Sequence, residues 1–384
     1  MSFDQFLNAV ILSVLSIWVV GCASQSNNTL NNEITIVAGG DWDDKWTRGG
    51  TTRQSLSIGA SHDLILMAGD LSYDGLDGEV EYNIQNAKNW SLRANAIVGN
   101  TPVLFVAGDH DSKIQDGDIA TYAKTLNHPD GTNGVLPPTG VLAGSDYEGK
   151  YPYLWFSDVI DGDAKVRIVG TSSAFQESDH EPASAQKYLK NTYAVGSENY
   201  KWIEAVYKDA KNKGYWLLHL NHLPWIDMGK NQSFADSQGL IDLASAYGVN
   251  VLMTGSSHNI WRTKPLKIDA DRCATIALTA GAQGANPDCV GNFRNTNYKK
   301  SDGLIQAHAG VAGKAKALNL NKYPDACDPK ADGEVKHYAA DGSCVTSGFA
   351  GVVSLKITAT TLSGEFIKTD GSVFKPYSFV IKRD

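Results

Sequence analysis

The sequence predicts an α/β fold in which two mixed β-sheets pack face to face between helices, a four-layer α/β/β/α sandwich. Short apolar runs alternate with helical segments in the first third of the chain, which indicates buried strands joined by helices. The last part of the chain instead alternates polar and apolar residues, as antiparallel strands do. No repeat or strong linker divides the chain, so residues 33–384 are expected to form a single domain.

The first elements follow a β-α-β-α-β order. The run containing Ile34, Ile36 and Val37 predicts a buried strand, and two similar runs follow it. Each of these three strands ends in a glycine followed by an aspartate. The expected strands are 33–40, 63–68 and 102–107, and the helices between them are 51–60 and 79–98.

The later elements alternate strands with two further helices. Trp202, Ile203, Val206 and Tyr207 fall on one stripe, which predicts an amphipathic helix over 197–213. A second helix is expected at 237–247. The expected strands are 153–156, 166–169, 215–220, 249–253, 274–278, 351–358, 361–368 and 377–381.

The composition is that of an ordinary folded protein. The chain has 384 residues, 42% hydrophobic and 20% charged, and a formal net charge of -8. This acidic balance argues against a nucleic-acid partner. An acidic protein that acts on an anionic substrate needs a local positive charge, and a bound metal ion can supply it.

The N-terminus resembles an export signal. Residues 6–20 are apolar, too short to span a bilayer comfortably, and followed by small residues, so residues 1–22 are expected to be a signal peptide. Val19-Val20-Gly21-Cys22 resembles a bacterial lipobox, in which a lipid on Cys22 would attach the protein to a membrane. A simply cleaved signal with an incidental cysteine is the alternative. Residues 23–32 would form a polar tether, and the protein would be secreted, periplasmic or bound to the cell envelope.

Four cysteines remain after Cys22, and an even number in an exported chain predicts two disulfides. Pairing of neighbours, Cys273 with Cys289 and Cys327 with Cys344, is favoured among three connectivities. Three of these cysteines lie in a segment rich in Gly and Asn that is expected to be an insertion at about 285–347. An alternative function makes this segment a surface interaction module.

Aspartates and histidines, two residue types that bind metals, follow the strands. Asp41, Asp70 and Asp109 each come directly after a glycine at a strand end, and His222 and His258 follow two later strands. The carboxyl ends of such strands gather functional residues in α/β folds, and glycine lets them crowd together. Carboxylates mixed with imidazoles suit Fe, Mn or Zn rather than Ca.

The order of these blocks resembles the calcineurin-like metallophosphoesterases, especially the purple acid phosphatases of the tartrate-resistant type. The resemblance spans roughly residues 34 to 262. It is carried by Gly40-Asp41-Trp42-Asp43, Gly69-Asp70-Leu71-Ser72-Tyr73, Gly108-Asp109-His110-Asp111, His222 before Leu223-Pro224-Trp225, and Gly255-Ser256-Ser257-His258.

The resemblance implies two metal ions. The first, an iron, would be held by Asp41, Asp70, Tyr73 and His258, with the tyrosinate giving the family its colour. Asp70 would bridge to a second ion, Fe, Zn or Mn. The remaining ligands of that second ion would be Asp109, His222 and the residue at position 256.

Two positions of the second site depart from the family pattern. Asp109 stands where the family has Asn, and Ser256 stands where it has His. Aspartate remains a ligand for hard metals, whereas serine is a poor neutral ligand for a divalent ion. The second site is therefore expected to be weak or empty unless another group replaces the histidine.

The activity implied by the resemblance is acid-phosphatase-like hydrolysis of phosphate monoesters by a metal-bound hydroxide. His110 would protonate the leaving alkoxide, and Asp111 beside it would orient or charge that ring. The alternative is a degenerate member with one metal or none, acting as a binding or surface protein. Ser256 discriminates the two, because restoring histidine there should raise hydrolysis only on a competent scaffold.

A further histidine and three tryptophans lie near the motifs. His219 is an odd number of residues from His222 along a strand, so its side chain should face the opposite side and not replace the missing ligand. Trp42, Trp225 and Trp261 follow motif residues and would either wall a substrate pocket or pack in the core; packing is the preferred interpretation.

Overall fold

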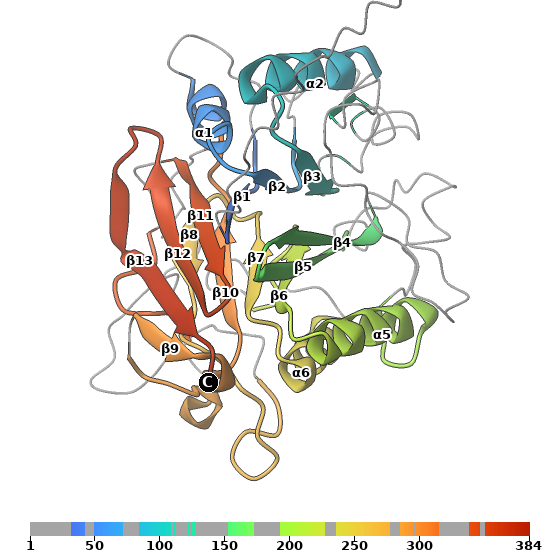
Figure 1. Ribbon diagram of the computed structural model, residues 1–384, viewed down its shortest axis with the longest axis vertical. Helices are drawn as coiled ribbons and strands as arrows, with labels where there is room; N and C mark the ends of the chain where they lie inside the picture. The colour runs from blue at the N-terminus through green and yellow to red at the C-terminus, as the bar shows by residue number, and fades with distance from the viewer. Residues whose placement is uncertain are drawn as a thin grey trace, which may run out of the picture.

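The computed structural model contains two mixed β-sheets with helices on their outer faces (Figure 1). The residues that the structure describes are 32–42, 50–71, 84–108, 111, 122, 125–126, 153–172, 193–226, 236–276, 285–294, 296–314, 338–345 and 350–384.

The first sheet joins the beginning of the chain to its end. Strand β1 pairs in parallel with β2, and β2 pairs in parallel with β3. On its other side β1 pairs antiparallel with β11, the first strand of the C-terminal meander. The order across this sheet is β3 (Val103–Val106), β2 (Leu64–Ala68), β1 (Glu33–Gly39), β11 (Gly351–Thr358), β12 (Thr361–Lys368), β13 (Val373–Lys382) and β9 (Asn297–Lys299).

The second sheet has a parallel centre. Strands β5, β6, β7 and β10 run parallel, and β4 and β8 close the two edges antiparallel. The order across this sheet is β4 (Leu154–Asp161), β5 (Ala164–Thr171), β6 (Trp216–Asn221), β7 (Val251–Thr254), β10 (Ile305–Ala309) and β8 (Ile260–Arg262).

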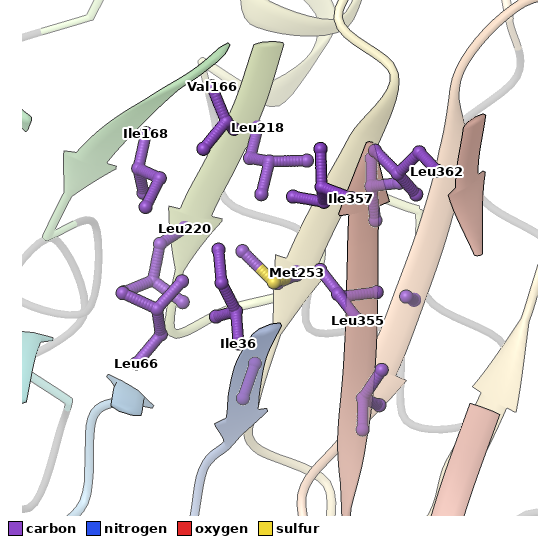
Figure 2. Close-up of a cluster of buried hydrophobic side chains, with 14 of the residues drawn as sticks. Ile36, Leu66, Val166, Ile168, Leu218, Leu220, Met253, Leu355, Ile357 and Leu362 are labelled. Atoms are coloured by element: carbon purple, nitrogen blue, oxygen red, sulfur yellow. The ribbon is translucent and has the colours of Figure 1, made fainter. Parts of the chain in front are cut away.

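The main core lies between the two sheets. Figure 2 shows side chains from both sheets meeting there, among them Ile36 and Leu355 from the first and Leu218 and Met253 from the second. Alternate residues of each strand face this core because successive side chains in a strand point to opposite sides. Leu218 and Leu220 face inward, so His219 between them faces outward.

Helices cover the outer face of each sheet. Helices α1 (Thr51–Gly59) and α2 (Ile84–Val98) pack on the parallel part of the first sheet through Leu56, Trp90 and Ala94. Helices α5 (Glu198–Asn212) and α6 (Ser237–Tyr247) pack on the second sheet. Two short 3-10 helices, η3 (Pro287–Cys289) and η4 (Lys300–Asp302), precede and follow β9. The four-layer α/β/β/α arrangement predicted from the sequence is confirmed.

The segment 285–347 contributes strands to both sheets. Strand β9 extends the first sheet, and β10 lies between β7 and β8 in the second. Its apolar residues Ile305, Ala307 and Ala309 belong to the core between the sheets. An insertion was expected over this whole segment, but residues 297–309 are part of the sheet framework.

The predicted disulfide between Cys273 and Cys289 is present. Cys344 is also disulfide-bonded, to a partner outside the described residues. Residues 274–276, expected to begin a strand, do not form one, and Cys273 instead makes an isolated bridge with Asp269. No helix among the described residues is long and apolar enough to cross a membrane.

Candidate metal centre

The site forms where the carboxyl ends of strands from both sheets meet. Asp41 and Asp70 follow β1 and β2 of the first sheet. His222 and His258 follow β6 and β7 of the second sheet. All four lie on connections after parallel strands, the edge at which the sequence places the metal ligands.

Backbone hydrogen bonds lock these connections together. The amide of Asp41 donates to the carbonyl of Gly69 over 3.2 Å, and the amide of Trp42 donates to the carbonyl of Asp70 over 2.8 Å. Within the second sheet, the amide of Gly255 donates to the carbonyl of His222 over 3.0 Å. The backbone frame of the site therefore does not depend on the side chains that it presents.

Glycine is required before Asp41 and Asp70 because a Cβ atom at either position would clash with neighbouring atoms. A Cβ on Gly40 would lie 2.6 Å from Cα of Gly255, so the two sheets could not approach as closely with any larger residue. Gly69 has a φ of +77°, and a Cβ there would lie 2.7 Å from Nδ1 of His222. The repeated Gly-Asp pattern is thus a consequence of close backbone packing.

The first carboxylate–imidazole pair consists of Asp41 and His258. Nε2 of His258 lies 2.9 Å from Oδ1 of Asp41. The Asp41 side chain is buried, at 1% exposure, whereas that of His258 is 19% exposed. Both residues are among the four expected to hold the first metal, so the structure brings these two together.

The second pair consists of Asp70 and His222, both buried. Nδ1 of His222 lies 2.6 Å from the carbonyl oxygen of Ala68, so Nδ1 carries the proton and donates it. Nε2 of the same ring lies 3.5 Å from Oδ1 of Asp70. In the neutral ring the lone pair is then on Nε2, which faces the Asp70 carboxylate, and an imidazole nitrogen and a carboxylate placed in this way can both bind a metal ion.

The backbone of the site is strained. Asp41 and Asp70 have φ values of 58° and 53°, and Ser256, Ser257 and His258 follow one another at 68°, 60° and 49°. Residues other than glycine rarely adopt this left-handed region, and runs of three are rarer still. Strain of this kind concentrates at functional sites, where the surrounding structure holds it in place.

Asp111 supports the loop that carries Asp70. Its carboxylate accepts hydrogen bonds from the amides of Asp70, Leu71 and Gly108 over 2.7, 2.9 and 2.8 Å. Burial raises the pKa of Asp111 to about 6, although these hydrogen bonds oppose the shift. Sequence reasoning assigned Asp111 only to the ring of His110, and this structural role was missed.

A loop after β10 closes the site over Asp41 and was also missed. The amide of Gly40 donates to the carbonyl of Ala309 over 2.9 Å. The amides of Gly313 and Lys314 donate to the carbonyl of Asp41 over 3.0 and 2.9 Å. The sequence feature that could have indicated this loop is Gly310. A Cβ at that position would lie 2.9 Å from Oδ2 of Asp41, so only glycine fits there.

Three expected site residues, Tyr73, Asp109 and His110, lie outside the described residues. Ser256 is described, 5% exposed, and lies in the strained turn before His258. Among the described residues no group of three or more His, Cys, Asp or Glu gathers closely enough to form a metal site by itself. The described part of the site thus consists of the two carboxylate–imidazole pairs.

The interpretations of His219 and the tryptophans agree with the structure. His219 is buried on the outer face of β6, between Tyr207 and Thr171, and does not reach the metal centre. Trp42, Trp225 and Trp261 are all fully buried. They pack in the core and do not wall an open pocket.

Comparison with known protein families identifies the family to which this chain belongs. The family model for calcineurin-like phosphoesterases matches residues 34–259, from the first strand to the residue after His258. The chain belongs to the calcineurin-like phosphoesterase family. The family resemblance seen in the sequence is confirmed, and membership of this family supports a metal-dependent phosphoesterase. No curated protein matches this phosphoesterase-family chain.

Solved structures share the fold of this phosphoesterase-family chain. A purple acid phosphatase from yellow lupin (Lupinus luteus) seeds is 18% identical, with a TM-score of 0.58 over 92% of this chain and 54% of that one. PhoD is 12% identical, with a TM-score of 0.52 over 92% and 70%. GAP50 of Plasmodium is 10% identical, with a TM-score of 0.50 over 89% and 87%. The chain spans about half the length of the lupin enzyme, and at these identities the likeness concerns the fold.

Proposed function

We propose that the protein is a metal-dependent phosphoesterase that hydrolyses phosphate monoesters, as acid phosphatases do. The observation that carries the proposal is the pair Asp70 and His222. In the neutral ring of His222, the hydrogen bond to the Ala68 carbonyl places the proton on Nδ1 and the lone pair on Nε2, which faces a buried carboxylate. A neutral imidazole and a carboxylate in this arrangement are ligands for a cation.

Asp41 and His258 would hold one metal ion, and Asp70 and His222 would hold a second, with Asp70 shared. Tyr73 and Asp109 are proposed to complete the two sites. When bound, the metal ions would polarise the phosphate and lower the pKa of an attacking water.

The proposed acid is His110. It would give its proton to the leaving alkoxide, because an alcohol leaves more easily than an alkoxide ion. Asp111 would hold the loop of Asp70 in place through the backbone amides that it accepts from. Iron is proposed for the first site and iron, zinc or manganese for the second, since carboxylate and imidazole ligands suit these metals.

The test combines metal analysis with hydrolysis. The purified protein, loaded with iron and zinc, should contain about two metal ions per chain and hydrolyse an aryl phosphate monoester faster than the matching diester. Protein that binds metal but releases no phosphate from any ester would refute the proposal. A Ser256→His variant should raise the rate by about tenfold or more, since the restored ligand strengthens the second site. A Ser61→His variant, on the exposed turn after α1, should leave the rate unchanged.

A second candidate function is binding without hydrolysis. Serine at position 256 favours it, because a neutral hydroxyl holds a divalent ion poorly. GAP50, described as an anchor in the inner membrane complex of Plasmodium, has the same fold. A single metal equivalent per chain, no hydrolysis, and no gain from Ser256→His would favour this candidate.

We also propose that the protein acts outside the cytoplasm. The disulfide between Cys273 and Cys289 supports an oxidising compartment, because cytoplasmic thiols are normally kept reduced. The mass of the mature N-terminus tests the proposal. Acylated Cys22 would indicate membrane attachment through a lipid, an unmodified mature N-terminus near residue 22 would indicate release, and a retained Met1 would contradict export.

A further inference from the structure

A chain of buried hydrogen bonds runs from helix α5 to the backbone that follows His222. The hydroxyl of Tyr207 lies 2.5 Å from Nδ1 of His219, and Nε2 of His219 lies 2.8 Å from Oγ1 of Thr171. The hydroxyl of Thr171 donates to Oδ1 of Asn221 over 3.0 Å. Nδ2 of Asn221 donates to the carbonyl of Leu223 over 2.6 Å. We call these four side chains, Tyr207, His219, Thr171 and Asn221, the relay.

The relay has only one arrangement of protons. The single hydroxyl proton of Thr171 goes to Asn221, so Oγ1 of Thr171 must accept a proton from Nε2 of His219. A neutral His219 protonated on Nε2 has a lone pair on Nδ1, which accepts from Tyr207. Each donor thus meets one acceptor, and each member orients the next.

Burial stabilises the hydrogen-bonded orientation of the relay side chains. Tyr207, His219, Thr171 and Asn221 are each 0% exposed, so water cannot substitute for a lost partner. The ring of His219 also packs at 4.7 Å from the ring of Trp225 and at 5.9 Å from that of Tyr207. Burial lowers the pKa of His219 to about 3, which agrees with the neutral ring that the hydrogen bonds require.

The relay ends on both sides of His222. Asn221 precedes that histidine, and its side chain bonds the carbonyl of Leu223, which follows it. The side chain of Asn221 therefore spans the turn from which the imidazole projects. The ring itself is held by Ala68 and its backbone carbonyl by Gly255. The relay therefore adds a side-chain restraint on this turn to the backbone hydrogen bond from Gly255.

We propose that the relay positions His222 and thereby sets the affinity of the second metal site. The inference deepens the proposed function and rests on its metal centre. The members of the relay are positioning residues, because none of them reaches the site. Changes to residues that orient a metal ligand typically lower metal affinity by about 10-fold to 100-fold.

The experiment compares two variants at one position. Thr171→Val keeps the shape of the side chain and removes the hydroxyl, whereas Thr171→Ser keeps the hydroxyl. Zinc is titrated into the metal-free full-length protein against a chromophoric chelator, which gives the affinity of each site without any substrate. Thr171→Val should weaken one of the two sites by about 10-fold to 100-fold, and Thr171→Ser should stay within about threefold of the wild type.

A control separates positioning from a general loss of stability. Val166 lies on the same strand as Thr171 but faces the core between the sheets. Val166→Ala should lower the melting temperature at least as much as Thr171→Val while leaving both zinc affinities unchanged. If Thr171→Val binds zinc as the wild type does, or if Val166→Ala weakens binding equally, the relay does not position the ligand.

Two further measurements apply if Thr171→Val does not fold. Tyr207→Phe removes one hydroxyl at the far end of the relay and should weaken the same zinc site by a smaller factor. Nitrogen NMR of the imidazoles should show His219 neutral and protonated on Nε2, and the opposite tautomer would overturn the inference. Normal zinc binding without hydrolysis would contradict only the proposed function, whereas a wild type that binds no zinc would overturn both.

Discussion

Nε2 of His258 lies 2.9 Å from Oδ1 of Asp41, and the two residues come from different sheets. Asp41 follows β1 in the first sheet, and His258 follows β7 in the second. The contact therefore forms only when both sheets are correctly packed.

Asp41→Asn should reduce both metal content and hydrolysis. The change keeps the size of the side chain and removes the negative charge that a cation requires, so the rate should fall by about 100-fold or more. Metal analysis and phosphate release measure the two effects. Glu33→Gln, at the surface pair between Glu33 and Lys356, serves as the control and should change neither. Wild-type metal content in Asp41→Asn would exclude Asp41 as a ligand.

Gly69→Ala should destabilise the protein far more than Gly371→Ala. Both glycines have positive φ, +77° and +84°, so alanine meets similar backbone strain at both, about 1–2 kcal/mol. At Gly371 nothing lies within 4 Å of the added Cβ, whereas at Gly69 the Cβ would lie 2.7 Å from His222. The crowding at Gly69 should lower the free energy of unfolding by a further amount of about 1–3 kcal/mol, measured by urea unfolding. Equal decreases in the free energy of unfolding for the two variants would show that the backbone around Gly69 can relax.

Asp111→Asn should lower the free energy of unfolding by about 2–4 kcal/mol, because buried amides of the Asp70 loop lose an acceptor. Hydrolysis should fall as well, since the same loop carries Asp70, a proposed metal ligand. Asp63→Asn is the matched control: its carboxylate accepts from the amide and hydroxyl of Thr35 at an exposed position. The control should lose about 1 kcal/mol or less and keep its activity. Loss of stability without loss of activity in Asp111→Asn would separate the loop from the site.

Stability should fall in acid because of His219. Burial lowers its pKa from 6.5 to about 3 in the folded protein. The unfolded chain therefore binds one more proton between these two values, and stability falls as the pH drops from 6.5 toward 3. The slope due to this group is at most about 1.4 kcal/mol per pH unit. Urea unfolding between pH 7 and pH 5 should show a shallower dependence in His219→Gln than in the wild type, and identical dependences would contradict the assignment.

Removal of the disulfide should lower stability without affecting the metal centre. Cys273 and Cys289 are 16 residues apart, and a loop of about that length typically contributes about 3 kcal/mol. The double variant Cys273→Ala, Cys289→Ala should unfold at lower urea concentration yet keep its metal content and its activity. Loss of metal from the folded double variant would instead assign a functional role to the cysteine-containing region.

The sequence was sufficient for the fold and for the four expected site residues that the structure describes in the two pairs. Two of the Gly-Asp junctions placed Asp41 and Asp70 at neighbouring strand ends, and the later strands placed His222 and His258 beside them. Strand periodicity also gave the outward orientation of His219 correctly. These predictions succeeded because a strand's end and its alternation are local properties of the chain.

Other features depend on partners that are distant in sequence. The hydrogen bond from His222 to the carbonyl of Ala68 cannot be predicted from the sequence around either residue, because every residue has a carbonyl. The same holds for the amides that Asp111 accepts from. The loop after β10 was missed because its segment, rich in Gly and Asn, was interpreted as an insertion although β10 lies inside the second sheet.

The close approach of Gly40 and Gly255 has a consequence for how this protein can change. Main-chain atoms hold the two sheets at that point, so a side chain next to it can be exchanged while the architecture stays intact. Ser256 occupies such a position. Under the proposed function, one exchanged codon at position 256 would alter the rate of hydrolysis while the scaffold stays the same.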